Sequence, residues 1–282
     1  MVHEVTEGGA GKSGRHSAAY GRDGKAHTVA SPVDIGDLGA SRTEEIVPQD
    51  IPPLTEQTRR EVREIIARYP MPRSALLPML HLVQSVQGYV SSQGVALCAE
   101  ELNLTKAEVG AVVTFYTMFK RRPAGEYLIS VCTNTLCGFL GGEEIYAALQ
   151  RQLGVHHDQT TVDGQFTLEH AECLAACDYA PVVTVNYEFY DQQSVESATA
   201  LVDALRAGEA PVPTRGAALC SFREMSREIA GFASADRVAA ALVGSSIGEP
   251  SLAGLRLAAE RGEGPPAAPP AGGAPAPAGK DA

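Results

Sequence analysis

The chain has 282 residues, of which 44% are hydrophobic, and its formal net charge is −11. This composition is typical of a globular protein, and the acidic balance argues against nucleic-acid binding, because nucleic-acid-binding proteins present a basic face to phosphates. No uninterrupted apolar stretch approaches the roughly 18–20 residues that a membrane-spanning helix needs.

The amino-terminal region and the cysteine content together predict where the protein works. Residues 1–24 contain no apolar core of the kind that secretory signals have, so we expect a cytoplasmic protein. Thiols stay reduced in that compartment. The six cysteines are therefore expected to serve metal binding or catalysis rather than structural disulfides.

Changes in composition along the chain predict five segments. Residues 1–50 are rich in Gly, Ser, Asp and His and lack apolar periodicity, which predicts a disordered arm. Residues 264–282 consist mostly of Gly, Pro and Ala, which predicts a disordered tail. Three segments lie between them: a helical bundle over 51–120, a small α/β domain over 121–210, and a partly helical carboxyl-terminal extension over 211–263.

The segment 51–120 has the pattern of several short amphipathic helices. Apolar residues recur at helical spacing from Val62 to Tyr69, and Gly88 is placed to end a second helix. The sequence TKAE, residues 105–108, is a capping box that predicts the start of another helix. Short helices this close together predict a small helical bundle. Three aromatic residues near its end are expected to belong to its core rather than to a contact surface: Phe115, Tyr116 and Phe119.

The segment 121–210 alternates between strand and helix patterns. The sequences EYLISV and PVVTVN predict buried strands, and EFYDQ follows closely enough to pair antiparallel with the second. Asp163 and Gly164 predict a turn between two further extended pieces. Helical patterns occupy 141–154 and 194–208. The predicted fold class is therefore α/β (α+β), a helical bundle followed by a small α/β sandwich of thioredoxin type.

Four of the six cysteines form two pairs inside this segment. Cys132 and Cys137 come directly after the EYLISV strand, and Cys173 and Cys177 precede the PVVTVN strand, after 35 intervening residues. We expect the loop after the first strand and the loop before the second to meet at one end of the sheet, so that four thiolates converge. Four thiolates suit a zinc ion or an iron–sulfur cluster.

The spacing within the pairs favours a two-iron cluster over a single zinc ion. Structural zinc prefers a gap of two residues, whereas gaps of four and three fit two irons that share bridging sulfides. A thiol exchanger would need C-x-x-C, and a Rieske centre would need histidine ligands near each pair; His170, three residues before Cys173, is only a weak candidate. Zinc and buried cysteines without metal remain alternatives. Cys98 and Cys220 lie in apolar, helix-like sequence and are expected to pack.

Several motifs, in this order, resemble a known family: LHLVQSVQGYVS, VVTFYTMF, VCTNTLCGFLGG and TTVDGQFTLEHAECLAACDYAPVVTVN. From about Leu54 to Arg206 the chain resembles the 24-kDa (NuoE-type) subunit of the proton-pumping NADH:quinone oxidoreductase, respiratory complex I. The resemblance implies a helical bundle followed by a thioredoxin-like [2Fe–2S] ferredoxin domain, with flexible termini. It also implies the four ligands of one [2Fe–2S] cluster: Cys132, Cys137, Cys173 and Cys177.

The resemblance further implies a function and partners. The cluster would exchange single electrons with the FMN of a partner subunit of the 51-kDa type that also binds NADH, and we expect this chain to hold neither FMN nor NADH. It would be a subunit of an oxidoreductase without catalytic residues of its own. The large iron–sulfur subunit would be a second partner, and the chain would lie in the peripheral arm on the cytoplasmic side, reaching the membrane only through the complex. The alternatives are the equivalent diaphorase subunit of an NAD-linked hydrogenase or formate dehydrogenase and, from another class, a structural zinc or scaffold module.

Overall fold

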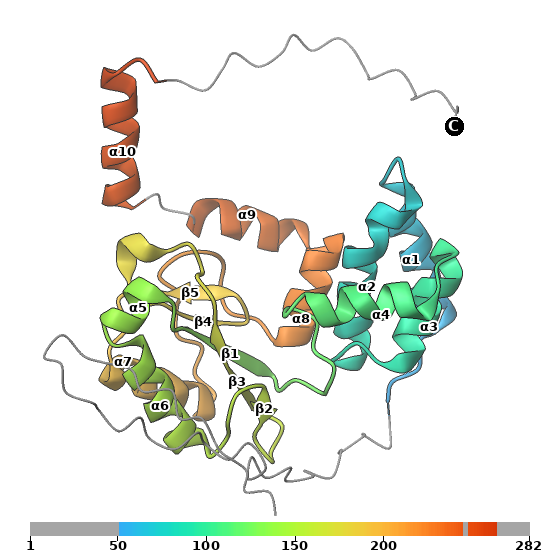
Figure 1. The fold of residues 1–282 in the computed structure, drawn as a ribbon, viewed down its shortest axis with the longest axis horizontal. Coiled ribbons are helices and arrows are strands. Elements are labelled where there is room, and N and C mark those ends of the chain that lie inside the picture. The colour runs from blue at the N-terminus through green and yellow to red at the C-terminus, as the bar shows by residue number, and fades with distance from the viewer. Residues whose placement is uncertain (1–50, 245–247, 264–282) are drawn as a thin grey trace, which may run out of the picture. The chain divides into compact units, whose positions relative to one another are not determined.

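The computed structural model describes residues 51–244 and 248–263 (Figure 1). The predicted arm over 1–50 and the predicted tail over 264–282 lie outside these ranges. The described residues all belong to one compact unit. Within them, no helix is both long enough and apolar enough to cross a membrane.

Four helices form the first part of the described chain. The predicted capping box is present: the Glu108 N–H donates to Thr105 Oγ1 at 3.2 Å, and the Thr105 N–H donates to the Glu108 carboxylate at 2.9 Å. Gly88 ends the second helix with φ of 78°, a left-handed conformation that glycine adopts without strain. The helices are α1 (Glu56–Ala67), α2 (Leu76–Gln87), α3 (Ser92–Leu102) and α4 (Lys106–Phe115), with a 3-10 helix (Pro72–Ala75) before α2.

The bundle has a continuous apolar core that includes Cys98, which is fully buried as predicted. The prediction for the three aromatic residues holds only in part. Phe119 is buried, but the side chains of Phe115 and Tyr116 are 76% and 40% exposed. These two residues follow the last buried turn of α4 and lie on the surface, because Tyr116 leaves the helix in an extended conformation.

His81 is a buried histidine inside this bundle. Its ring packs on Phe119 with the centroids 4.9 Å apart, and Nδ1 has no hydrogen-bond partner among the described residues. Burial lowers the pKa of His81 from 6.5 to about 4, because the charged imidazolium has no compensating partner there.

Acid should therefore destabilise the protein through His81. Its contribution to stability is complete above pH 6.5 and is lost as the pH falls towards 4, because the unfolded chain takes up the proton first. At pH 5 we expect a loss of about 2 kcal/mol relative to pH 7.5 from this group. Urea unfolding at both pH values should show that His81→Leu loses about this much less than the wild type. An equal loss in the two proteins would contradict the assignment.

A five-stranded mixed sheet forms the second part, with the strand order β2-β3-β1-β4-β5. The central strand β1 runs parallel to β3 and antiparallel to β4. The predicted turn joins β2 and β3, with Gly164 at φ of 71°. The strands are β1 (Tyr127–Cys132), β2 (Gln159–Thr160), β3 (Phe166–Ala171), β4 (Val183–Val185) and β5 (Glu188–Tyr190). The predicted α/β fold class is confirmed.

Two helices, α6 (Gly142–Leu153) and α7 (Val195–Arg206), cover one face of this sheet (Figure 1). Their apolar side chains form a single core with Ile129 and Val131 of β1. Side chains alternate between the two faces of a strand, so Ser130 and Cys132 lie on the opposite face. That second face carries polar groups and one of the predicted ligands.

The chain beyond residue 211 returns to the helical bundle. Helix α8 (Phe222–Arg227) packs on α2 and continues into a π-helical turn (Glu228–Phe232). The Arg223 guanidinium donates to the carbonyl oxygens of Ser85, at 3.0 Å, and Val86. The helical pattern predicted around 217–230 therefore begins at residue 222. Two further helices follow, α9 (Ala235–Gly244) and α10 (Glu249–Glu260).

Candidate metal centre

The two predicted cysteine pairs lie in loops at the same end of the sheet. Cys132 is the last residue of β1, and Cys173 and Cys177 follow β3, which runs parallel to β1. Strand β4 is antiparallel to β1 and therefore begins at this same end. The Cys132 N–H donates to the Val182 carbonyl at 3.1 Å, which ties the first loop to the approach of β4.

The first pair is buried against the loop that carries the second pair. Cys137 lies in α5 (Thr135–Phe139), a helix of five residues that the sequence pattern did not predict. Cys132 and Cys137 are only 2% and 3% exposed, and both pack with Ala176 and Val182. The two loops thus share a small apolar core around these two thiols.

The second pair is exposed and spaced for a metal ion. The sulfur atoms of Cys173 and Cys177 are 3.6 Å apart. A tetrahedral ion with metal–sulfur bonds of about 2.3 Å separates two thiolates by about 3.7–3.8 Å. Ala175, between them, has φ of 58°, a left-handed conformation that is uncommon for a residue with a side chain. The link between these cysteines therefore already has a local geometry that suits one metal ion.

The thiols of the two pairs influence one another. The pKa of Cys137 is raised to about 11, first by burial and then by the neighbouring Cys132 and Cys177, while a hydrogen bond from the Val182 N–H acts in the opposite direction. The pKa of Cys177 is raised mainly by Cys173 and also by Cys132. The four sulfurs therefore form one electrostatic group. A bound cation would favour its deprotonation, because thiolates are the ligands that metals take.

The arrangement of donors fits a two-metal group better than a single ion. Across residues 51–244 and 248–263, no three His, Cys, Asp or Glu side chains are arranged to hold one metal ion. Two neighbouring pairs can instead each hold one iron of a cluster with bridging sulfides. His170, the weak ligand candidate, stacks on His157 with the ring centroids 4.3 Å apart. It belongs to a polar pocket beside the centre.

A glycine allows α6 to begin directly against the cysteine loops. A Cβ atom at Gly142 would lie 2.5 Å from the carbonyl oxygen of Cys132 and 2.9 Å from that of Cys137. Real Cβ atoms do not approach backbone oxygens this closely, so any side chain at this position would displace one of the loops. The backbone around both buried thiols therefore depends on glycine here.

Gly142→Ala should accordingly weaken the metal centre. We expect a loss of about 1–3 kcal/mol in stability, as for other overpacking substitutions, together with a lower metal content. Gly110→Ala is the matched control, because its Cβ would meet nothing within 4 Å, and its position inside α4 should make alanine stabilising by about 0.5–1 kcal/mol. Chemical unfolding and metal analysis of both variants test this. Equal stability and metal content would argue against the close approach.

Comparison with known proteins places this centre in a family. Residues 62–206 match the family model described as thioredoxin-like [2Fe-2S] ferredoxin, which is more than half of the chain. The matched region contains both cysteine pairs and the whole five-stranded sheet. The bundle helices α2, α3 and α4 also fall within it.

Curated relatives agree with this match. The NuoE-type subunit of NADH-quinone oxidoreductase from Mycobacterium tuberculosis (strain ATCC 25618 / H37Rv) is 53% identical over 212 residues, which cover 75% of this chain and 83% of that protein. A NuoE-type subunit from Rhizobium meliloti (strain 1021) is 34% identical over 151 residues, covering 54% of this chain and 90% of the relative. An NAD+-reducing [NiFe]-hydrogenase in the air-oxidized state matches 47% of this chain and 23% of its own at a TM-score of 0.43 and 22% identity, too weakly to distinguish between assemblies. The chain belongs to the thioredoxin-like [2Fe–2S] ferredoxin family and, within it, to the NuoE-type subunits of NADH-quinone oxidoreductase.

Proposed function

We propose that this chain is the electron-transfer subunit of an NADH-quinone oxidoreductase and holds one [2Fe–2S] cluster. The observation that carries the proposal is the convergence of two thiol pairs at one end of a thioredoxin-like sheet, in a chain 53% identical to NuoE-type proteins. When bound, the cluster supplies a carrier of single electrons. The proposed ligands are Cys132, Cys137, Cys173 and Cys177.

The protein's own residues have different roles at this site. The buried pair, Cys132 and Cys137, keeps water away from one side of the centre, and the Val182 N–H provides a hydrogen bond to a ligand sulfur. Such bonds favour the more negative, reduced form of a cluster. The exposed pair, Cys173 and Cys177, leaves the other side at the surface, where electrons can pass to and from a partner.

An apolar patch beside the centre supports a docking partner. Leu136, Phe139 and Leu140 are 43%, 87% and 49% exposed, and they surround Cys137 in the sequence. Large apolar side chains grouped on a surface are typical of protein interfaces. We assign this patch to the FMN- and NADH-binding subunit of the 51-kDa type. The large iron–sulfur subunit is the second proposed partner, with the complex's peripheral arm on the cytoplasmic side of the membrane.

Reductive titration of the purified full-length chain tests the electron-transfer role. With dithionite under anaerobic conditions, the protein should take up about one electron per chain while its visible absorption decreases. The same protein reconstituted with zinc is the control, because zinc has no accessible redox change. A colourless protein that takes up no electrons would favour the structural zinc or scaffold alternative.

Affinity purification of the tagged chain from its own cells distinguishes between the assemblies. We expect recovery of the flavin-containing and large iron–sulfur subunits of an NADH-quinone oxidoreductase. Recovery of a hydrogenase or formate dehydrogenase in their place would assign the chain to a diaphorase unit instead.

A further inference from the structure

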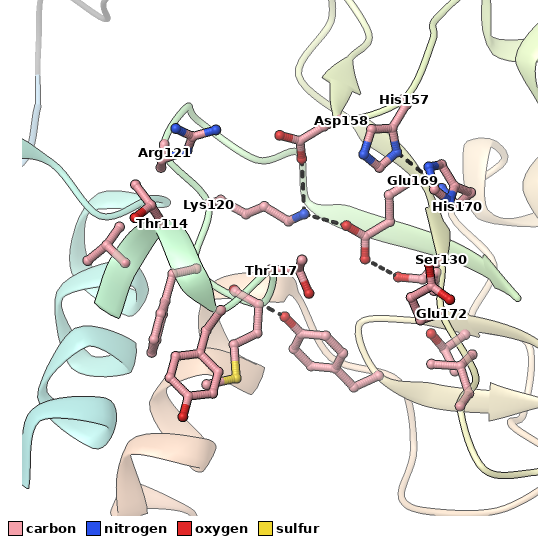
Figure 2. Close-up of a pocket in the computed structure, with 18 of the residues that line it drawn as sticks. Thr114, Thr117, Lys120, Arg121, Ser130, His157, Asp158, Glu169, His170 and Glu172 are labelled. Atoms are coloured by element: carbon pink, nitrogen blue, oxygen red, sulfur yellow. Dashed lines mark hydrogen bonds and ion pairs between the residues drawn. The ribbon is translucent and has the colours of Figure 1, made fainter. Parts of the chain in front are cut away.

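A polar pocket of about 470 Å³ lies beside the proposed centre. Its walls come from the end of α4 and the following loop, from the second face of the sheet, and from the loop after β3, including Cys173. Figure 2 shows an ammonium group from one wall meeting carboxylates from the opposite wall. The pocket therefore brings buried charges close to the loop of the exposed cysteine pair.

Lys120 is the centre of this arrangement (Figure 2). It is only 5% exposed, and its ammonium group donates to Asp158 at 3.0 Å and to Glu169. The second carboxylate oxygen of Glu169 accepts from Ser130 Oγ at 2.6 Å. Burial would lower the pKa of Lys120, but the two carboxylates outweigh it and the pKa is raised, so the ammonium stays charged.

The register of the sheet brings these charges near a proposed ligand. Glu169 on β3 lies beside Ser130 on β1, and two residues further Ala171 lies beside Cys132. Residues two apart share a face of a strand and are separated by about 7 Å. Glu169, through its bond to Ser130, therefore holds its charge on the same face as the Cys132 side chain. Charges this deeply buried are screened little by salt.

We propose that the buried ion network of Lys120 and Glu169 tunes the reduction potential of the cluster. This inference rests on the proposed function, because it requires a cluster on the four cysteines. Reduction adds one negative charge at the centre. The ammonium of Lys120 therefore favours reduction, and the carboxylate of Glu169 opposes it, so both act as positioned charges without touching the ligands' sulfur atoms.

Single substitutions at the two positions should move the potential in opposite directions. Glu169→Gln keeps an acceptor for Ser130 but removes a negative charge, so the potential should become more positive. Lys120→Met removes the positive charge and should make it more negative when measured at pH 8, where carboxylates stay ionised. A unit charge about 10 Å away should change the reduction equilibrium roughly tenfold, which corresponds to about 60 mV for one electron.

Potentiometric titration followed by electron paramagnetic resonance, in the full-length chain, measures these shifts. Two matched controls remove the same charges far from the centre: Lys106→Met at the start of α4 and Glu100→Gln in α3, both of which are exposed. Neither should shift the potential. The double variant of Lys120→Met and Glu169→Gln has the same net charge as the wild type in this network and should return close to its potential.

Opposite shifts with silent controls would support the inference, because damage to the fold would move both variants in the same direction. Shifts of the same sign, or potentials equal to that of the wild type in variants that retain the cluster, would overturn it while leaving the proposed function intact. A wild-type chain without iron and labile sulfide would instead overturn the proposed function itself. The two failures are therefore distinguishable.

Discussion

Replacing Cys132 by serine should remove or strongly deplete the cluster from the purified chain. Cys132 lies at the end of the central strand, is 2% exposed, and packs against both cysteine loops. Iron in such clusters is held by thiolates, and a serine hydroxyl at this position is a much poorer ligand. Visible absorption and iron content per chain, compared with those of the wild type, measure the loss.

Two cysteines outside the proposed centre provide the controls for this experiment. Cys98 is fully buried in the bundle, and Cys220 is half-buried beside the Arg237 guanidinium, with sulfur and nitrogen 3.3 Å apart. Burial raises the pKa of both thiols, to about 12 and about 11, so neither is poised to form a thiolate. Cys98→Ser and Cys220→Ser should keep their iron. Loss of the cluster in either folded variant, or its full retention in Cys132→Ser, would refute the ligand assignment.

Phe222→Ala should destabilise the protein by about 3–5 kcal/mol, the usual cost of truncating a fully buried phenylalanine. Phe222 is 0% exposed and lies in α8, which packs on α2, with its ring 6.2 Å from that of Tyr187. The cavity left by alanine would open where the returning chain meets the bundle and the residues after β4. Urea unfolding of the wild type and the variant gives the difference in free energy.

Phe115→Ala is the matched control, because this side chain is 76% exposed and its loss should change stability by no more than about 0.5 kcal/mol. Similar stabilities for the two variants would show that α8 contributes little to the fold. The expected result has a wider meaning, since Phe222 lies beyond the region 62–206 that matches the family model. The carboxyl-terminal segment would then be an integral part of the fold in this chain.

Local signals in the sequence were sufficient to predict the elements that carry the candidate centre. The capping box at Thr105 and the glycine at the end of α2 act within a few residues of the helix that each one limits. The convergence of the two cysteine loops followed from the expected order of the strands. Parallel strands β1 and β3 end on the same side, and β4 starts there.

Other local features left no clear signal. Helix α5, which carries Cys137, is only five residues long, and Asn134 before it makes no side-chain capping hydrogen bond. A helix this short is set by its packing against the cysteine loops rather than by propensity. Phe115 and Phe119 belong to one aromatic motif, yet only Phe119 is buried, because α4 ends between them.

Contacts between distant parts of the chain were beyond prediction from one sequence. Lys120 meets Glu169 across 49 residues, and Arg223 meets the Ser85 carbonyl across 138. A lysine in an Arg- and Lys-containing loop has no pattern that distinguishes a buried ion pair from a solvated surface charge. These contacts depend on how the bundle, the sheet and the returning segment pack together.

Metal and sulfide analysis of the purified full-length chain is the most direct test of the proposed cluster. We expect about two iron atoms and two acid-labile sulfides per chain, lost together when a proposed ligand is replaced. Since the sulfide is part of the cluster and of no simple metal site, its stoichiometry separates a cluster from a zinc site without any activity assay. About one zinc ion per chain with no labile sulfide would contradict the cluster assignment.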